Sequence, residues 1–550
     1  MQKKYTVGID FGSLSARAVL VDTVDGRECA SAEYPYPHAV MTERDITGGA
    51  AGATTALQHP LDYIEALGIT VKGVLAKSGI APESVAALAL DFTASNILPT
   101  LECGAPLAML DEFQNEPHAY VKMWKHHGAS AEAEAFTERA NELDRMILEP
   151  YSGKLSSEWA FSKIYETLNK APRVYERAEL FFEAGDWLVY MLTGKLCRSA
   201  CMVGYKALWN DKKSYPCNEL FTSVDPRLSG IIASKMRGEV IPLGDTQGAL
   251  NEYGAMLTGL PVGTPVASAV IDAHAALPAA GAVKPGDLMI IVGTSACHIL
   301  ISDQDKPVPG ICGRVKGGVV PEYMAYESGQ PAVGDALSWF MKNCVPSRCE
   351  KEAEELGIGL FDYMDKKAEA IGVGSGGLLA LDWWNGSRTP YADYELSGLI
   401  LGLTLSTPPE AIYRAIIESI AFGTRRIIEG YKEAGVPVKR IIVGGGIAKK
   451  NAFIMQTFAN VLGMDVSVTD ATQAGAMGSA IYAAVSAGIY KSVGEAAERM
   501  AAGIIKVYHP DEEAVELYEP IYKEYVELCE HFHSESGVMK RLRRLGSKPV

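Results

Sequence analysis

The residues that point most directly to chemistry form one short segment near the amino terminus. Asp10 follows the apolar run Val7-Gly8-Ile9, and Gly12 and Ser13 come shortly after it. A tight glycine turn offers backbone N–H groups and a hydroxyl to a phosphate, while a carboxylate beside it can hold a hydrated Mg²⁺. Taken alone, these residues are explained equally well by an ordinary hairpin that opens a sheet.

A second segment of the same kind lies in the other half of the chain. Residues 287–292 are an apolar run that ends at Gly293-Thr294-Ser295, and residues 297–302 are the predicted returning strand. Repetition of a supersecondary unit is a signal of fold. Two lobes that each carry such a turn would grip a nucleoside triphosphate in the cleft between them. Chance similarity between two short hairpins is the alternative.

A third glycine cluster, Gly444-Gly445-Gly446, follows a predicted strand at 440–443 and precedes an amphipathic helix predicted over 450–462. Backbone without side chains can approach a flat ring closely, so this turn is a candidate seat for adenine. A strand-to-helix turn also needs glycine for structural reasons. The chain has no Walker A sequence, and the glycines at 372–377 lack the preceding strand of a dinucleotide fingerprint.

The elements that must position these turns follow one order in both halves. Periodicity predicts strands over 5–9, 15–22, 29–36 and 85–90, with a helix over 61–75. The second half repeats this with strands over 287–292, 297–302, 318–326 and 440–443, and helices near 331–344 and 409–434. This order predicts an α/β protein of two duplicated lobes, 1–265 and 266–550.

Composition narrows the classes of partner. A chain of 550 residues with 48% hydrophobic residues is too long for one compact domain. Its net charge of -16 disfavours nucleic acid and anionic membranes as partners. No apolar run approaches the ~18 residues of a membrane span, and no signal-peptide core follows the amino terminus. We therefore expect a cytoplasmic protein.

Several reactive side chains are interpreted as structural. The ten cysteines form no Cys-x-x-Cys pair and are expected to be reduced thiols. His126 and His127 are expected to be a surface pair on a helix. Arg17 suits a structural or solvated role as well as a catalytic one, and Trp124 is best interpreted as a core residue.

The motifs together resemble the FGGY carbohydrate kinases, a family with the actin-like ATPase (ribonuclease H-like) fold. The resemblance rests on the hairpin at 8–17, Ile271-Asp272-Ala273-His274, Gly293-Thr294-Ser295 and Gly444-Gly445-Gly446, in that order. The segments 91–95, 156–159, 183–187 and 204–206 are similar to the ribulokinase branch of that family. Ala411 departs from the pattern, because the family's C-terminal signature usually has a polar residue there.

The resemblance implies roles for individual residues. Asp272 is implied as the base that accepts the proton of a sugar hydroxyl, which is a poor nucleophile at neutral pH. A helix N-cap is the structural alternative for this aspartate. The implied sugar contacts are Thr93, Ala94, Ser95, Lys206, Asp272 and Glu327. The implied nucleotide contacts are Gly12, Ser13, Gly293, Thr294, Ser295, Gly444, Gly445, Gly446 and Asn451, with Asp10 for Mg²⁺.

The function that the resemblance implies is ATP-dependent phosphorylation of a ketopentose, with ATP and Mg²⁺ as cofactors. L-ribulose, converted to L-ribulose 5-phosphate in L-arabinose catabolism, is the expected substrate. A kinase for D-ribulose, ribitol or xylulose is the alternative within the same class. An actin-like ATPase without sugar kinase activity is the alternative of another class, and it would not need Asp272 as a base. A homodimer is an expectation at the level of the family.

Overall fold

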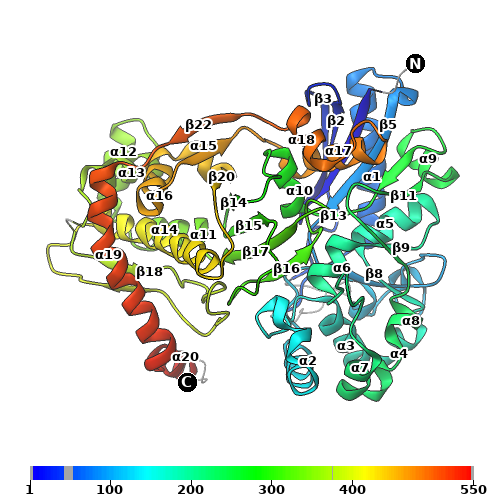
Figure 1. Ribbon diagram of the computed structural model, residues 1–550, viewed down its shortest axis with the longest axis horizontal. Coiled ribbons are helices and arrows are strands. Elements are labelled where there is room, and N and C mark those ends of the chain that lie inside the picture. The colour runs from blue at the N-terminus through cyan, green and yellow to red at the C-terminus, as the bar shows by residue number, and fades with distance from the viewer. Residues whose placement is uncertain (1–3, 43–53, 375, 547–550) are drawn as a thin grey trace. The chain divides into compact units, whose positions relative to one another are not determined.

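The computed structural model describes residues 4–42, 54–374 and 376–546 (Figure 1). The chain forms two compact units. Unit 1 comprises residues 1–284, 314–325 and 471–502, and unit 2 comprises 285–313, 326–470 and 503–550. These compact units do not coincide with a single boundary at residue 265, because 266–284 and 471–502 pack within unit 1. The two functional lobes, 1–265 and 266–550, stay a prediction.

Unit 1 is built on a sheet that opens with the first predicted hairpin. The strand order is β11-β12-β5-β1-β2-β3, and β13 also pairs with β5. β1 is antiparallel to β2 and parallel to β5, so the hairpin continues into a parallel arrangement. The strands are β1 (Tyr5–Phe11), β2 (Ser15–Asp22), β3 (Glu28–Pro35), β5 (Val85–Phe92), β11 (Thr246–Ala249), β12 (Pro265–Ala267) and β13 (Val270–Ile271).

Two helices cover the opposite faces of this sheet (Figure 1). Alternate residues of β1 point to opposite faces. Phe11 stacks on Phe92 at 4.6 Å and meets Tyr63 of α1 (Pro60–Ser78) edge-on. On the other face, a Cβ at Gly8 would lie 1.8 Å from the carbonyl oxygen of Ala476 in α17 (Ala474–Ser486). Because Asp10 shares the face of Gly8, it lies beneath α17.

A second, smaller sheet of unit 1 has the order β4-β7-β6-β8. Its strands are β4 (Leu57–Gln58), β6 (Ile97–Thr100), β7 (Val121–Lys122) and β8 (Leu180–Glu183), and β9 (Cys197–Ser199) pairs separately with β10 (Glu239–Ile241). The remaining α-helices are α2 (Ser130–Leu143), α3 (Ala160–Lys170), α4 (Pro172–Arg177), α5 (Ala184–Thr193), α6 (Ala200–Lys206), α7 (Asn218–Val224), α8 (Ile231–Lys235), α9 (Glu252–Thr258), α10 (Asp272–Ala279) and α18 (Val493–Met500).

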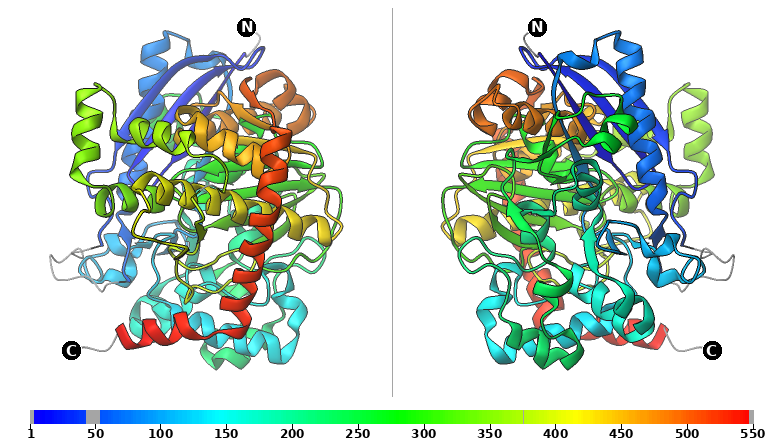
Figure 2. Two further views of the ribbon diagram at one scale, coloured as in Figure 1. Left: turned by 90° about the vertical axis from the view of Figure 1, so that its left-hand side faces the viewer. Right: turned by 90° about the vertical axis from the view of Figure 1, so that its right-hand side faces the viewer.

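Unit 2 contains the second predicted hairpin in a sheet that runs β17-β15-β14-β20-β21-β22. The strands are β14 (Asp287–Val292), β15 (Ala296–Ser302), β17 (Met324–Gln330), β20 (Arg440–Gly444), β21 (Val466–Thr469) and β22 (Ile504–Tyr508), and β18 (Leu379–Leu381) and β19 (Leu399–Leu401) form a separate pair. The α-helices are α11 (Gly334–Asn343), α12 (Ser347–Glu355), α13 (Leu360–Ala370), α14 (Pro409–Glu433), α15 (Gly446–Lys450), α16 (Ala452–Leu462), α19 (Glu512–Glu530, the long red helix of Figure 2) and α20 (Val538–Gly546).

Two sequence-based elements differ from the structure. The strand predicted over 318–326 is wrong for most of its length, since β16 (Gly313–Lys316) ends before it and β17 begins at Met324. Gly317 is left-handed at φ +69°, and the chain turns before β17 starts. The helix predicted over 450–462 begins two residues later, because Lys450 ends α15 and Asn451 caps α16, which runs from Ala452 to Leu462. None of the helices within the described ranges is both long and apolar enough to cross a membrane.

Candidate active site

Three carboxylates of unit 1 meet where neighbouring parallel strands end. Asp10 of β1 pairs in register with Asp91 of β5, and Ile271 of β13 pairs with Phe92 of the same strand. Asp272 follows directly and is the first residue of α10, whose N-cap is Ile271. The expected structural alternative, an Asp272 N-cap, is therefore wrong. The carboxyl ends of strands are where sheets of this kind bind ligands.

The electrostatics of this carboxylate cluster favour a bound cation. Burial raises the pKa of Asp10, and it raises the pKa of Asp91 further, with the charges of Asp10 and Asp272 adding to the effect. Asp91 Oδ2 accepts a hydrogen bond from Ser479 Oγ at 2.7 Å. Asp91 Oδ1 is buried and has no hydrogen-bond partner in the described residues. Oxygen ligands with excess negative charge fit Mg²⁺, and Asp10 and Asp91 are the residues that would hold it.

Helix α17 contacts this cluster through Gly475, a residue that the sequence analysis missed. A Cβ at Gly475 would lie 2.8 Å from Asp91 Oδ1 and 3.1 Å from Asp10 Cγ. Only glycine lets the helix backbone come so close. Gly475 and Ser479 are four residues apart, so they share one helix face. The pair of small residues was the signal in the sequence, and Asp91 itself was noted only as part of the segment 91–95.

The tip of the first hairpin is held by side chains from elsewhere in unit 1. The Gly12 N–H donates to the carbonyl oxygen of Ser15 at 3.0 Å. Gln58 Nε2 donates to the carbonyl oxygen of Ser13, and Trp124 Nε1 donates to Ser13 Oγ at 3.0 Å. Trp124 is 38% exposed, so its interpretation as a core residue is wrong. The hairpin is thus fixed before any ligand arrives.

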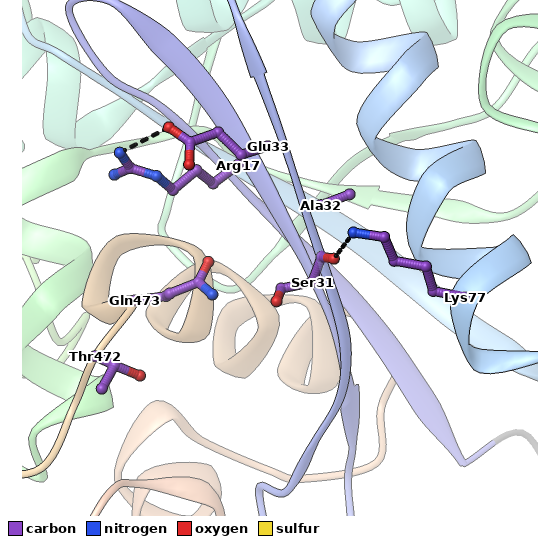
Figure 3. A pocket seen from close by; sticks show the side chains of 7 residues that line it. All are labelled: Arg17, Ser31, Ala32, Glu33, Lys77, Thr472 and Gln473. Atoms are coloured by element: carbon purple, nitrogen blue, oxygen red, sulfur yellow. Dashed lines mark hydrogen bonds and ion pairs between the residues drawn. The ribbon is translucent and has the colours of Figure 1, made fainter.

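Arg17 lies opposite Asp10 on β2 and lines a pocket of about 350 Å³ (Figure 3). Its guanidinium donates to Glu33 at 2.9 Å, and Ser15 Oγ donates to the same carboxylate oxygen. The charge of Arg17 lowers the pKa of Asp10, against the larger effect of burial. Arg17 therefore stabilises the ionised form of Asp10, and the hydrogen bond to Glu33 fixes the position of the Arg17 side chain. The lining residues are Arg17, Ser31, Ala32, Glu33, Lys77, Thr472 and Gln473.

The predicted sugar loop, residues 93–95, follows β5 within the same unit. The Thr93 N–H donates to the carbonyl oxygen of Phe11 at 3.1 Å, next to Asp10. Ser95 has a left-handed φ of +60°, and its buried Oγ has no hydrogen-bond partner in the described residues. Lys206 ends α6 and is 9% exposed, and its charge lowers the pKa of the buried Glu183 against the effect of burial. Thr93, Ala94, Ser95, Lys206 and Asp272 therefore all belong to unit 1.

Unit 2 brings two of the predicted glycine turns together. β14 and β20 are parallel neighbours, with Ile291 opposite Gly444. The turn Gly293-Thr294-Ser295 follows β14, and Gly445 and Gly446 follow β20, so both turns lie at the same edge of the sheet. Gly445 has φ +102°, and a Cβ there would lie 2.1 Å from the carbonyl oxygen of Val292. Glycine is required at 445 by this close approach alone.

Asn451 has structural partners of its own, and Glu327 lies in a different unit from the predicted sugar loop. Asn451 Oδ1 accepts from the N–H of Ile454 at 2.9 Å, and its Nδ2 donates to Asp365 at 2.7 Å. The role of Asn451 toward a nucleotide stays a prediction. Glu327 is buried on β17 and belongs to unit 2. Its place beside the unit 1 sugar residues stays a prediction as well.

Two histidine groups outside this site are explained by structure. His126 is buried, lies outside any helix and contacts Glu166 at 2.8 Å, so its expected place in a surface pair is wrong. His38, His59 and Asp62 lie close enough for one metal ion. However, both oxygens of Asp62 already contact His38, and the two imidazole rings are stacked at 4.3 Å. The positive end of α1 also disfavours a cation there.

Two family models cover most of the chain. The N-terminal domain of the FGGY family of carbohydrate kinases matches residues 5–278, and the C-terminal domain of that family matches residues 288–487. Curated ribulokinases of Anoxybacillus flavithermus and Halalkalibacterium halodurans are each 43% identical to this chain. They align over 99% and 100% of it, and over 97% and 98% of their own lengths.

The fold agrees with these relatives. A crystal structure of ligand-bound xylulose kinase from Lactobacillus acidophilus matches with a TM-score of 0.80 at 19% identity, over 97% of this chain and 99% of that one. The predicted α/β fold of the actin-like ATPase type is confirmed. Since both family models match and full-length relatives align from end to end, this chain belongs to the FGGY family of carbohydrate kinases.

Proposed function

We propose that this kinase transfers the γ-phosphoryl group of ATP to L-ribulose, forming L-ribulose 5-phosphate for L-arabinose catabolism. The observation that carries the proposal is the cluster of Asp10, Asp91 and Asp272 beside the polar loop 93–95. The 43% identity to ribulokinases over the whole chain supports the choice of sugar.

Asp272 would act as the general base. A sugar hydroxyl must lose its proton as its oxygen attacks phosphorus, and a positioned carboxylate contributes about 10²–10⁴-fold to such a step. Asp272 is held at the start of α10, where its Oδ1 accepts from the N–H of Ala273 at 2.7 Å. This bond would orient the carboxylate as it takes the proton.

A Mg²⁺ ion held by Asp10 and Asp91 would supply positive charge to the phosphoryl group as negative charge spreads over its oxygens. This chain would add backbone N–H groups of the turns at Gly12 and Gly293, and the hydroxyls of Ser13, Thr294 and Ser295. The turn at 444–446 would seat the adenine, where a Cβ built at Gly446 would meet nothing within 4 Å.

The sugar would contact Thr93, Ala94, Ser95, Lys206 and Glu327. Two features of unit 1 support this assignment. The buried Ser95 hydroxyl has no hydrogen-bond partner in the described residues, and an unpaired buried hydroxyl is costly unless a ligand satisfies it. Lys206 is nearly buried at the end of α6, where a single ammonium group can orient a keto or hydroxyl oxygen.

The test is a coupled assay of ADP release with Mg·ATP against L-ribulose, D-ribulose, ribitol, D-xylulose and glycerol. Fastest turnover with L-ribulose is the expected result. Faster turnover with another sugar would keep the kinase and reject the proposed substrate. ADP release that no sugar accelerates would favour an ATPase of the actin-like type. We propose a cytoplasmic homodimer, which sedimentation analysis tests by its mass.

A further inference from the structure

The predicted sugar loop is bonded by a buried lysine that has no proposed role in catalysis. Lys163 of α3 is fully buried, and its Nζ donates to the carbonyl oxygens of Ser95 at 2.6 Å and Met123 at 2.8 Å. The charge of Glu183, the last residue of β8, raises the pKa of Lys163 against the larger effect of burial. Burial lowers the pKa of Lys163 to about 7 and raises that of Glu183 to about 8. Burying an ammonium group is costly, and the bonds of Lys163 to Ser95 and Met123 hold the backbone of the sugar loop and of the segment after β7.

Asn96 bonds within the same loop and ties it to two other segments. Its N–H donates to Glu183 Oε2 at 3.0 Å, and its Nδ2 donates to Thr93 Oγ1 at 2.8 Å. Its Oδ1 accepts from the N–H of Trp124 at 3.0 Å. Trp124 in turn donates to Ser13 of the first hairpin. One asparagine therefore links the sugar loop to Glu183 and, through Trp124, to the phosphate hairpin.

The loop needs such support because of its backbone. Ser95 adopts a left-handed conformation that residues with a Cβ rarely occupy. A strained backbone persists only where its surroundings hold it, and such positions gather at functional sites. The carbonyl oxygen of Ser95 is bonded by Lys163, while the Ser95 hydroxyl keeps no protein partner in the described part of the chain.

We propose that Lys163 and Asn96 are positioning residues of the sugar site. They hold Thr93, Ala94 and Ser95 in the one backbone conformation that leaves the Ser95 hydroxyl available to the substrate. This inference rests on the proposed function, because it assumes that the loop binds sugar. Neither residue touches the reacting atoms. Their removal should weaken sugar binding while leaving the binding of ATP unchanged.

The chain offers a matched control. Lys122 is also fully buried in this unit, but its Nζ donates to α3 alone: to Glu166 at 2.7 Å, to Thr167 at 2.8 Å and to the carbonyl oxygen of Lys163 at 3.1 Å. Glu166 would keep His126 and Lys170 as partners if Lys122 were replaced. Lys122→Met therefore removes a buried ammonium as Lys163→Met does, without removing a bond to the sugar loop.

The experiment compares Lys163→Met, Asn96→Ala and Lys122→Met by steady-state kinetics, melting temperature and hydrogen exchange of amides 93–97. We expect KM for the best sugar to rise about tenfold in Lys163→Met and Asn96→Ala, with KM for ATP within about twofold. Exchange at 93–97 should quicken in both. Lys122→Met should lower the melting temperature but leave the KM for sugar and the exchange at 93–97 unchanged.

The outcomes separate this inference from the proposed function. If KM for sugar follows the melting temperature in all three variants, the two residues are only structural and the inference is overturned. Quickened exchange without a change in KM for sugar also overturns it, because the loop would then not bind the sugar. If the unaltered protein phosphorylates no sugar, the proposed function fails first, and that result is visible before any variant is compared.

Discussion

Asp10 and Asp91 lie opposite each other on the parallel strands β1 and β5, beneath Gly475 of α17. When two buried carboxyl groups lie side by side, ionising both of them costs free energy. The protein thus holds an arrangement that is stable when one group is protonated or when a cation lies beside them. The free energy of unfolding should therefore depend both on pH and on metal binding at these two aspartates.

Asp91→Asn should therefore stabilise the metal-free protein at pH 8. The pKa values of both aspartates are raised on folding, so the native state binds more protons than the unfolded chain above pH 3.8. The free energy of unfolding then falls as pH rises through the raised pKa values, and the cost is fully present above them. We expect Asp91→Asn to raise the melting temperature at pH 8 by roughly 2 °C and to flatten its pH dependence.

Scanning calorimetry from pH 4 to pH 8 without metal measures this effect. Asp303→Asn, at an exposed carboxylate of unit 2, is the control and should change little. Addition of Mg²⁺ should stabilise the unaltered protein at pH 8 more than the Asp91→Asn variant. If the Asp91→Asn variant melted below the unaltered protein at pH 8, the charge of Asp91 would not destabilise the folded protein.

Gly475→Ala should damage the site through space alone. The new Cβ would meet Asp91 Oδ1 at 2.8 Å and Asp10 Cγ at 3.1 Å, so α17 or the strands must shift. Overpacking of this kind costs about 1–3 kcal/mol of stability, and we expect kcat to fall with it. Gly494→Ala on α18 is the matched control, since its Cβ would meet only an ordinary contact at 3.8 Å. Equal kcat values in the two variants would mean that α17 does not position the aspartates.

Lys206→Ala should act on sugar binding. We expect KM for the sugar to rise about tenfold or more, as loss of a hydrogen bond from a charged group does, while KM for ATP changes little. Initial-rate kinetics with each substrate varied in turn measure both constants. Equal increases in the two constants would place Lys206 outside the sugar site.

Local pattern predicted much of the fold. Residues 15–22 and 287–292 coincide with β2 and β14, because an apolar run bounded by turn residues specifies a buried strand. The local sequence pattern does not predict strand register or packing between residues that are far apart in the chain. The pairing of Asp10 with Asp91 depends on register, and the place of α17 in unit 1 depends on contacts between residues far apart in sequence.

Contacts between residues distant in sequence also explain why the positions of individual site residues were predicted wrongly. Trp124 was interpreted as a core residue because its partner, Ser13, lies more than a hundred positions earlier in the sequence. His126 was placed on a surface because its contact with Glu166 of α3 leaves no local pattern. Asp10 was found because it follows the predicted strand 5–9, whereas Asp272 was found only through the resemblance to the FGGY carbohydrate kinases.

The measurement that tests the account most directly is single-turnover phosphoryl transfer by Asp272→Asn with saturating Mg·ATP and L-ribulose. If Asp272 is the base, ATP should bind within about twofold of the unaltered protein while transfer slows by about 10²–10⁴-fold. Transfer at a near-normal rate in a variant that binds both substrates would show that another group accepts the sugar proton.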